Sequence, residues 1–511
     1  MAWTSLPPEI RLLVLEALVE DDDCNFADLA VVSKEWKGVI EQQNFQRIKL
    51  TPPRIAELDT MTLRNRNHVR YLWFCLELER YDCPQCTPED ELVPFMNTRD
   101  ITLIKAAFHH LFSVISNWAP DSCLSLDISV YSASDRDHWF KYLTFEPDAP
   151  PKAGRHDQEL DPETVLARQY DHRHQWEESD LDRHPQQWQR LPLVPLQSAI
   201  EKVFVQIMGI GDNYNAQDKD WCRQLPQVPA VTRILLRQQT RRRWNYADLA
   251  EIFAHLPRLR ELWYEPWREW DNGFQEMKDE EFIIDLLQSP PLRRLSSLTI
   301  FENFNDRYAQ AYMPIHCEEV RTPSFDISQM LSSISVNFDH LSASFMVDAG
   351  DFFGAEECQP PQRWPNLKSL VLTSEMLDPY ESHTNIMDML RKAALRSAYM
   401  PQLETMEIWN GGVGLAALFR YDGRTQPSIL EWRSTWDIKL GLSVIRAWEA
   451  VSMRRSGRGV ELVYDMLDSE NIHSHADAIL ALDLSELVIR PVSLHQIRRK
   501  HSWRRIADIL T

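Results

Sequence analysis

Glycine is scarce in this sequence, and the motifs that depend on it are absent. Only 14 of the 511 residues are glycine, and no GxxxxGK[ST], GxGxxG or GxSxG motif occurs. Phosphate-binding loops and nucleophile elbows need glycine where the backbone turns tightly or approaches a ligand closely. Because HExxH is missing as well, nucleotide-binding and hydrolase functions lack support, and we expect no enzyme activity and no cofactor.

Cysteines with the spacing of a structural metal site are also lacking. The eight cysteines are scattered along the chain, which favours a reducing compartment over a disulfide framework. Cys83 and Cys86 form a lone CxxC motif, whereas a zinc site needs four ligands. We interpret this motif as a turn around Pro84 with two ordinary thiols, and we predict no metal site.

Long apolar runs and a basic surplus are absent too. Segments such as 478–482 end well before the ~20 apolar residues that cross a bilayer. Glu9 and Glu16 interrupt the apolar N-terminus, which argues against a signal peptide, so we expect a protein of the cytoplasm, the nucleus or both. With 55 basic against 76 acidic residues, the net charge of −21 argues against nucleic-acid binding.

Apolar and aromatic residues, in contrast, are plentiful. Hydrophobic residues make up 44% of the chain, with 18 tryptophans and 20 phenylalanines, which excludes global disorder. A chain of 511 residues exceeds what one hydrophobic core usually supports. We therefore expect two or more domains, or an array of repeats.

Residues 1–50 have the pattern of a compact helical module. Pro7 and Pro8 suit the first turn of a helix, where a backbone donor would be unpaired, and Glu9 suits the positive end of its dipole. Apolar residues then recur at helical spacing in two segments. The first carries Ile10, Leu12, Leu13, Val14, Leu15 and Leu18, and the second carries Leu29, Val32, Trp36 and Ile40. The first stripe is wider than one small partner helix requires, which predicts an external partner.

Residues 51–465 repeat a short apolar strand, a turn and a helix. The clearest strands start at Leu259, Leu295, Leu341, Leu367, Leu403 and Ile429. Three of them follow a proline at matching offsets, in LPRLREL, WPNLKSL and MPQLETM. Since proline ends a helix and the following residues alternate, this pattern favours an α/β fold, an irregular leucine-rich-repeat-like solenoid.

Two other segments complete the domain organisation. The stretch 143–195 is rich in proline, histidine and charged residues and has little periodicity, so we expect an insertion or surface loop. Residues 466–511 have a helical pattern and end in a basic tail. We expect this segment to cap the array.

The N-terminal module resembles the F-box. LPPEIRLLVLEAL and LAVVSKEW contain the leucine-proline start, first helix and later valine, serine and tryptophan of that family, although the loop through Glu20 to Asn25 is longer than usual. The resemblance implies binding to a Skp-type adaptor and, through it, to a cullin ligase. The implied adaptor contacts are Leu6, Pro7, Ile10, Val14, Leu15, Leu18, Leu29, Val32 and Trp36. Beyond the motif, LWFCLELERYDCPQC and SVYSASDRDHWFK resemble uncharacterised F-box-associated proteins of filamentous fungi.

A basic cluster beside aromatic residues is our candidate for contact with a target protein. Arg241, Arg242 and Arg243 precede an aromatic run that includes Trp267 and Trp270. Arginine next to exposed aromatic side chains is typical of binding hot spots. The alternative is that the tryptophans pack between repeats while the arginines face water.

Two further groups of polar residues have side chains suited to metal binding or to acid–base catalysis. His172 and His174, with His156 and His184 nearby, have metal-ligand side chains but lie in a polar segment, where solvated histidines are the simpler interpretation. Asp135, Asp137 and His138 have no serine or cysteine nucleophile motif beside them, and turn hydrogen bonds account for Asp135.

The sequence therefore predicts the substrate receptor of a Skp-cullin-F-box ubiquitin ligase, which binds the adaptor through the F-box and an unknown target through the repeats. Two alternatives remain open. One is an F-box scaffold or regulator that works outside a ligase, and the other is an enzyme with a site between repeats.

Overall fold

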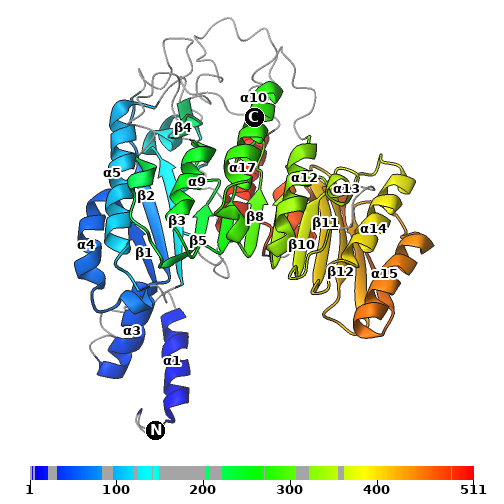
Figure 1. The fold of residues 1–511 in the computed structure, drawn as a ribbon, viewed down its shortest axis with the longest axis horizontal. Helices are drawn as coiled ribbons and strands as arrows, with labels where there is room; N and C mark the ends of the chain where they lie inside the picture. The colour runs from blue at the N-terminus through cyan, green and yellow to red at the C-terminus, as the bar shows by residue number, and fades with distance from the viewer. Residues whose placement is uncertain are drawn as a thin grey trace, which may run out of the picture.

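The structure is a computed structural model of the 511-residue chain (Figure 1). It describes residues 3, 6–20, 32–82, 96–119, 123–140, 142–148, 202–207, 221–269, 271–305, 322–354, 362–484 and 486–510. Among these residues, no helix combines the length and the apolar character that spanning a bilayer requires.

A single 12-stranded sheet runs through the molecule, and its strands lie side by side in the order of the chain. All neighbours pair in parallel except β12, which is antiparallel to both of its neighbours. The strands are β1 (Arg47–Leu50), β2 (Tyr71–Glu77), β3 (Leu124–Tyr131), β5 (Val231–Leu236), β7 (Glu261–Tyr264), β8 (Ser297–Phe301), β9 (His340–Ser344), β10 (Ser369–Thr373), β11 (Thr405–Gly412), β12 (Leu415–Asp422), β13 (Ser428–Ser434) and β14 (Val460–Met466). Two further strands, β4 (Gln206–Ile207) and β6 (Arg243–Trp244), form a separate parallel pair.

The helices that connect the parallel strands form one row on one face of the sheet, here called the helix face (Figure 1). They are α4 (Pro52–Thr62), α5 (Thr98–Ile115), α9 (Tyr246–Ala254), α10 (Asn272–Glu281), α12 (Phe325–Ile334), α13 (Ala349–Gly354), α14 (His383–Ser397) and α15 (Leu442–Ser456). Short polar caps start several of them: the Asn97, Asn245 and Ser324 side chains each accept a hydrogen bond from a backbone N–H in the first turn.

Alternation along each strand divides the sheet into two chemically different faces. In β3, Leu126, Ile128 and Val130 are buried in the core beneath the helices. Asp127 and Ser129 point to the other side, here called the opposite face, because successive side chains of a strand alternate. The helix face is apolar along the sheet, while the opposite face carries polar and aromatic residues and, from β10 to β12, also aliphatic residues such as Val371 and Leu418.

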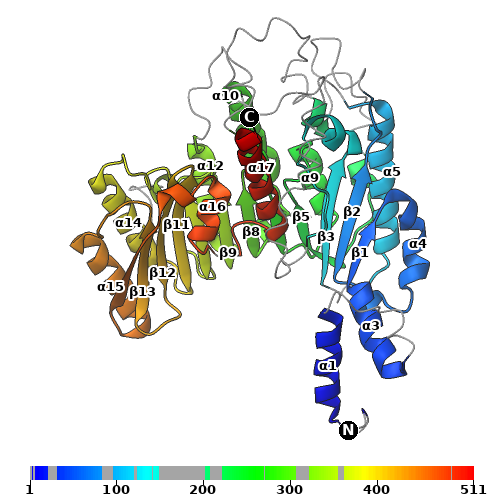
Figure 2. The same cartoon turned by 180° about the vertical axis from the view of Figure 1, so that it is seen from behind.

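The chain covers the opposite face with segments that are not crossover helices. Helix α16 (His475–Ala481) packs on β11 and β12, and helix α17 (Pro491–Leu510) continues across the middle of the sheet (Figure 2). Ile472, Ile479 and Ile497 join a second core cluster with Phe301 and Trp409 of the strands. Residues 142–148 cover the first strands, where the Phe145 and Tyr131 rings stack with centroids 3.8 Å apart.

The α/β class and most strands agree with the sequence pattern, with three differences. The sequence pattern did not predict β1, β14 or the antiparallel β12. The chain reaches β12 through a glycine turn in which Gly414 has a φ of +70°. The apolar pattern VFVQIM from Val203 also predicts a strand, but the structure has there only the two-residue β4, which lies outside the large sheet. The C-terminal segment does not cap the end of the array, because it lies across the face of the strands.

The helix-face core is expected to dominate stability. Leu372 of β10 is completely buried in it, so Leu372→Ala should lower the free energy of unfolding by about 2–5 kcal/mol, as removal of a buried leucine side chain does. Leu442→Ala, at a leucine 71% exposed on α15, should change it by less than about 0.5 kcal/mol. Urea unfolding followed by circular dichroism checks both, and equal losses would contradict this description of the core.

Candidate functional site

The N-terminal helices project from the first edge of the sheet (Figure 1). Helix α1 (Pro8–Glu20) packs against α3 (Lys34–Gln46), and α3 leads directly into β1. Ser33 caps α3 by accepting a hydrogen bond from the Trp36 N–H at 3.3 Å. The Arg11 and Glu35 side chains form an ion pair at 3.4 Å, and the Trp3 and Trp36 rings lie 5.3 Å apart. These contacts hold the two helices together.

Helix α1 exposes aliphatic side chains that nothing in the described part of the chain covers. Ile10, Leu12, Leu13 and Val14 are 37–59% exposed, and Leu13 is the most exposed of them. Val32, just before α3, is 59% exposed. Scattered apolar residues are normal on a surface, but a cluster on one short helix is typical of a contact site. We call Ile10, Leu12, Leu13 and Val14 the α1 patch.

The adaptor contacts that the resemblance implied occupy different environments. Ile10, Val14, Pro7 and Val32 are exposed, while Leu6, Leu18 and Trp36 are half-buried. Leu15 is 1% exposed and lies inside the module, so it cannot contact a partner directly. Leu29 and most of the long loop after α1 lie outside the described residues. Leu12 and Leu13 were not among the predicted adaptor contacts, although both belong to the wide apolar stripe that predicted an external partner.

Arg241, predicted to contact a target, is enclosed by aromatic rings instead. Its guanidinium carbon lies 4.0 Å from the Trp267 ring centroid and 4.4 Å from that of Phe140. One of its amino groups donates a hydrogen bond to the Tyr142 hydroxyl at 2.8 Å. The residue is 3% exposed, so these cation–π contacts are internal to the protein.

The neighbouring arginines are also engaged inside the fold. Arg242 forms an ion pair with the buried Asp135 at 2.9 Å. Arg243 donates two hydrogen bonds to Glu269, both at 2.6 Å. The interpretation of an exposed hot spot is therefore wrong for Arg241 and Arg242, and so is the alternative in which the arginines face water. Trp267 is half-buried, and Trp270 lies outside the described residues.

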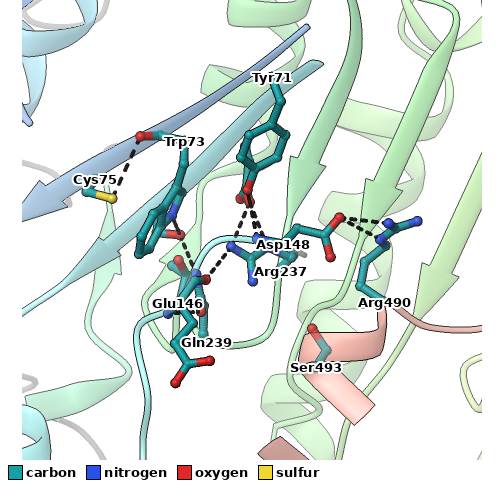
Figure 3. Close-up of polar contacts among 12 residues, drawn as sticks. Tyr71, Trp73, Cys75, Glu146, Asp148, Arg237, Gln239, Arg490 and Ser493 are labelled. Carbon is teal, nitrogen blue, oxygen red and sulfur yellow. Dashed lines mark hydrogen bonds and ion pairs between the residues drawn. The ribbon is translucent and has the colours of Figure 1, made fainter. Parts of the chain in front are cut away.

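A buried polar layer lies on the opposite face and links distant parts of the chain (Figure 3). Asp127 and Arg237 form an ion pair at 2.6 Å, with both side chains fully buried. The Tyr71 hydroxyl donates a hydrogen bond to Asp127 and accepts one from the Asp148 N–H at 2.8 Å. Burial, followed by the charge of Asp127, raises the pKa of Tyr71, so the hydroxyl stays protonated and remains a donor.

This layer also fixes the start of α17. The Arg490 guanidinium forms an ion pair with Asp148 at 2.7 Å and lies 4.6 Å from the Trp263 ring centroid. The Ser493 hydroxyl donates to Glu265, and the Gln238 side chain donates to the Ser493 carbonyl at 2.6 Å. Figure 3 shows Asp148, Arg490 and Ser493 converging beside the sheet. The chain thus holds its own C-terminal helix over the middle strands.

Sequence reasoning missed this polar layer. A signal existed, because Ser125, Asp127 and Ser129 occupy alternating positions between the apolar residues of the strand LSLDISV. A charge at one of those positions requires a buried partner or a hydrogen-bond network. The partner, Arg237, lies 110 residues further along the chain, and no local pattern identifies it.

Metal-ligating side chains do not gather anywhere in the described part of the chain. Among them, no group of three or more histidine, cysteine or acidic side chains could hold a metal ion. A cavity of about 290 Å³ lies at the carboxyl ends of β2 and β3, and its described lining includes Tyr81, Asp100, Lys202 and Arg242 but neither histidine nor cysteine. Asp135 accepts hydrogen bonds from the Tyr81 hydroxyl and the Ser132 N–H, so its role there is structural.

Two sets of predicted residues lie elsewhere. Cys83 and Cys86 lie outside the described residues, as do the histidines at 156, 172, 174 and 184. The backbone of His138 follows Asp135 and Asp137 in a π-helical turn, and its side chain is not among those described.

A family model matches part of the chain. Residues 289–490 match the model of a family of unknown function, DUF6546, and this segment is less than half of the 511-residue chain. No curated protein matches the chain. The matched segment runs from just before β8 to the residue before α17, so it contains the antiparallel strand, the last strand of the sheet and α16.

Breaking the buried ion pair should destabilise the protein. Asp127→Ala leaves the fully buried Arg237 guanidinium without its counter-charge, which should lower the free energy of unfolding by about 3–5 kcal/mol. The double variant Asp127→Leu with Arg237→Met removes both charges, so we expect it to be more stable than Asp127→Ala. Thermal unfolding of the parent and the two variants measures this, and a double variant no more stable than Asp127→Ala would contradict the pairing.

A second prediction concerns pH. Burial, reinforced by Glu302, raises the pKa of Asp279 to about 7, and Gln275 donates a hydrogen bond to it at 2.6 Å. Because the folded state favours the protonated acid, its contribution to stability is present below the ordinary pKa of 3.8 and is lost as the pH rises through 7. Asp279→Asn should therefore raise the melting temperature more at pH 8 than at pH 5. The exposed Asp437, replaced by asparagine, is the control, and a pH-independent difference would refute the assignment.

Proposed function

We propose that this protein is the substrate receptor of a Skp-cullin-F-box ubiquitin ligase, in which α1 and α3 bind a Skp-type adaptor. The α1 patch is the observation that carries this proposal. Four aliphatic side chains are exposed on one helix that projects from the sheet, and the described residues offer nothing that covers them.

The size of the patch fits a docking role. Burying a leucine or isoleucine side chain completely contributes about 1.5–3 kcal/mol, so a few such anchors suffice for a stable complex. An amphipathic helix that lays its apolar face into a partner's groove is a common mode of recognition. The internal contacts of Leu15 and Trp36 keep the helices in fixed relation, which reduces the entropy lost on binding.

The architecture supports a leucine-rich-repeat-like receptor domain. Parallel strands in chain order, with the crossover helices on one face, are the arrangement that a stacked strand–helix repeat produces. The array departs from a regular solenoid at β12, where three consecutive strands follow without a helix. Its scaffold role needs no catalytic residue, because a ligase receptor only has to present its target.

Target contact is expected at the carboxyl edge of the strands. The opposite face is covered by α16, α17 and residues 142–148, which makes most of it inaccessible to a target. Along the chain, 20 residues separate the carboxyl end of β2 from α5 and 23 separate that of β8 from α12, whereas the connections 63–70 and 255–260 at the amino edge are shorter. Long connections carried by a rigid scaffold are common binding elements.

The α1 patch should decide adaptor binding. Replacing Leu12 and Leu13 by aspartate puts charges where apolar anchors are required, so the affinity for a purified Skp-type adaptor should fall by about 100-fold or more. Titration calorimetry with the full-length chain measures the affinity. Leu442→Asp, at an exposed leucine on α15, is the matched control and should bind the adaptor like the parent protein.

Two outcomes bear on the proposal. Undiminished binding by the Leu12 and Leu13 variant would exclude the α1 patch as the interface, provided its circular dichroism matches the parent. If the adaptor binds but purification from cells never recovers a cullin, the protein is an F-box scaffold or regulator rather than a ligase receptor.

A further inference from the structure

The last strand of the sheet leaves one edge open. Within the described residues no strand pairs with the outer side of β14, which is seven residues long. Leu462, Val463, Tyr464 and Met466 are each 37–57% exposed. An edge strand has unpaired N–H and C=O groups, so a long apolar edge is a template for another strand.

The two ends of the sheet differ in how they resist such pairing. Strand β1 is four residues long and carries Arg47 and Lys49, and basic side chains on short strands discourage edge-to-edge contact. Strand β14, VELVYDM, contains no basic residue and no proline. The exposed apolar edge is therefore particular to the C-terminal end of the array.

Charges of alternating sign run across the strands that lead to β14 on the opposite face. Arg420 of β12 pairs with Glu407 of β11 at 2.9 Å and with Glu431 of β13 at 2.8 Å. Arg433 pairs with Glu431 at 2.8 Å and with Asp465 of β14 at 3.2 Å. Arg433 and Asp465 are partners in the strand register, so this network of ion pairs ends on an acid at the open edge.

A second acid at this edge has no counter-charge among the residues that the structure describes. Glu461 shares a face with Asp465, four residues along the strand, and no described basic group pairs with it. On the other face, Leu462 and Tyr464 continue the apolar rows of Leu430 and Trp432, their register neighbours in β13. A strand added here would meet Glu461 and Asp465, with Val463 between them, on one face and apolar side chains alone on the other.

We propose that β14 binds an extended segment of a partner protein in which basic residues alternate with apolar ones. The segment adds a thirteenth strand to the 12-stranded sheet. Its basic side chains lie beside Glu461 and Asp465, and its apolar side chains lie beside Leu462 and Tyr464. Backbone hydrogen bonds supply affinity in this mode of recognition, while alternate side chains supply specificity.

A second copy of the chain fits this edge poorly. Antiparallel pairing about Val463 uses the whole strand, but it places Glu461 opposite Asp465 of the other copy. Directly opposed like charges destabilise a strand pair. Each chain also carries a formal charge of −21, which opposes association.

The test uses the full-length protein and a fluorescent peptide, acetyl-VKVKVKV-amide. We expect fluorescence anisotropy to show binding, and hydrogen exchange to slow at the amides of β14. Glu461→Lys should weaken peptide binding by about tenfold, because it puts a cation beside the lysines. Glu280→Lys, the same charge change on α10, should leave binding unaltered and so controls for general attraction to an acidic protein.

Each other outcome overturns the proposal. Equal binding of a peptide with glutamate in place of lysine would refute the charge selectivity. Equal weakening by Glu461→Lys and Glu280→Lys, or slowed exchange elsewhere but not in β14, would show that the peptide binds another surface. A dimer in sedimentation whose formation protects β14 would assign the edge to a second copy. None of these measurements involves the adaptor, so the proposal stands or fails separately from the F-box function.

Discussion

The fold depends on covering both faces of one parallel sheet. Crossover helices lie on a single side, where alternate apolar residues of every strand pack against them. A parallel sheet is stable only when its second face is also covered, since strands there would expose backbone and aromatic side chains to water. This chain meets that constraint with residues 142–148, α16 and α17. The buried pair of Asp127 with Arg237 and the contact of Arg490 with Asp148 follow from it, because polar strand residues beneath the covering segments need partners.

The strands and their helix face were predictable because they depend on local pattern. LKSLVL and LSSLTI alternate clearly, and the preceding prolines mark where helices end. Strand β12 was missed because LAALFRYD is almost uniformly apolar and the glycine turn before it was not recognised. Strand β14 was missed because it is exposed and pairs on one side only. The position of α17 depends on contacts such as Arg490 with Asp148, 342 residues apart, which no local pattern contains.

The candidate adaptor site was likewise predictable only where it depends on local sequence pattern. The apolar stripe of α1 was visible in the sequence, whereas the burial of Leu15 and the exposure of Leu13 depend on how α3 packs beside it. The prediction for the arginine cluster was wrong because arginine beside aromatic residues is the composition of an exposed hot spot and of an internal cation–π cluster alike. Only the packing of Phe140 and Trp267 around Arg241 separates the two. The adaptor and target proposals therefore use different parts of the molecule from the arginines first selected.

The covering of the opposite face also sets the order in which the protein matures. Residues 467–500 are synthesised after all strands of the 12-stranded sheet, and until they emerge from the ribosome Trp263, Glu265 and Trp409 have nothing above them. A chain that folds while it is being synthesised would then hold an assembled helix face with an uncovered second side, a state prone to aggregation. Covering of the opposite face would thus be the last step of folding. A chaperone that shields the uncovered sheet during translation would act on this intermediate.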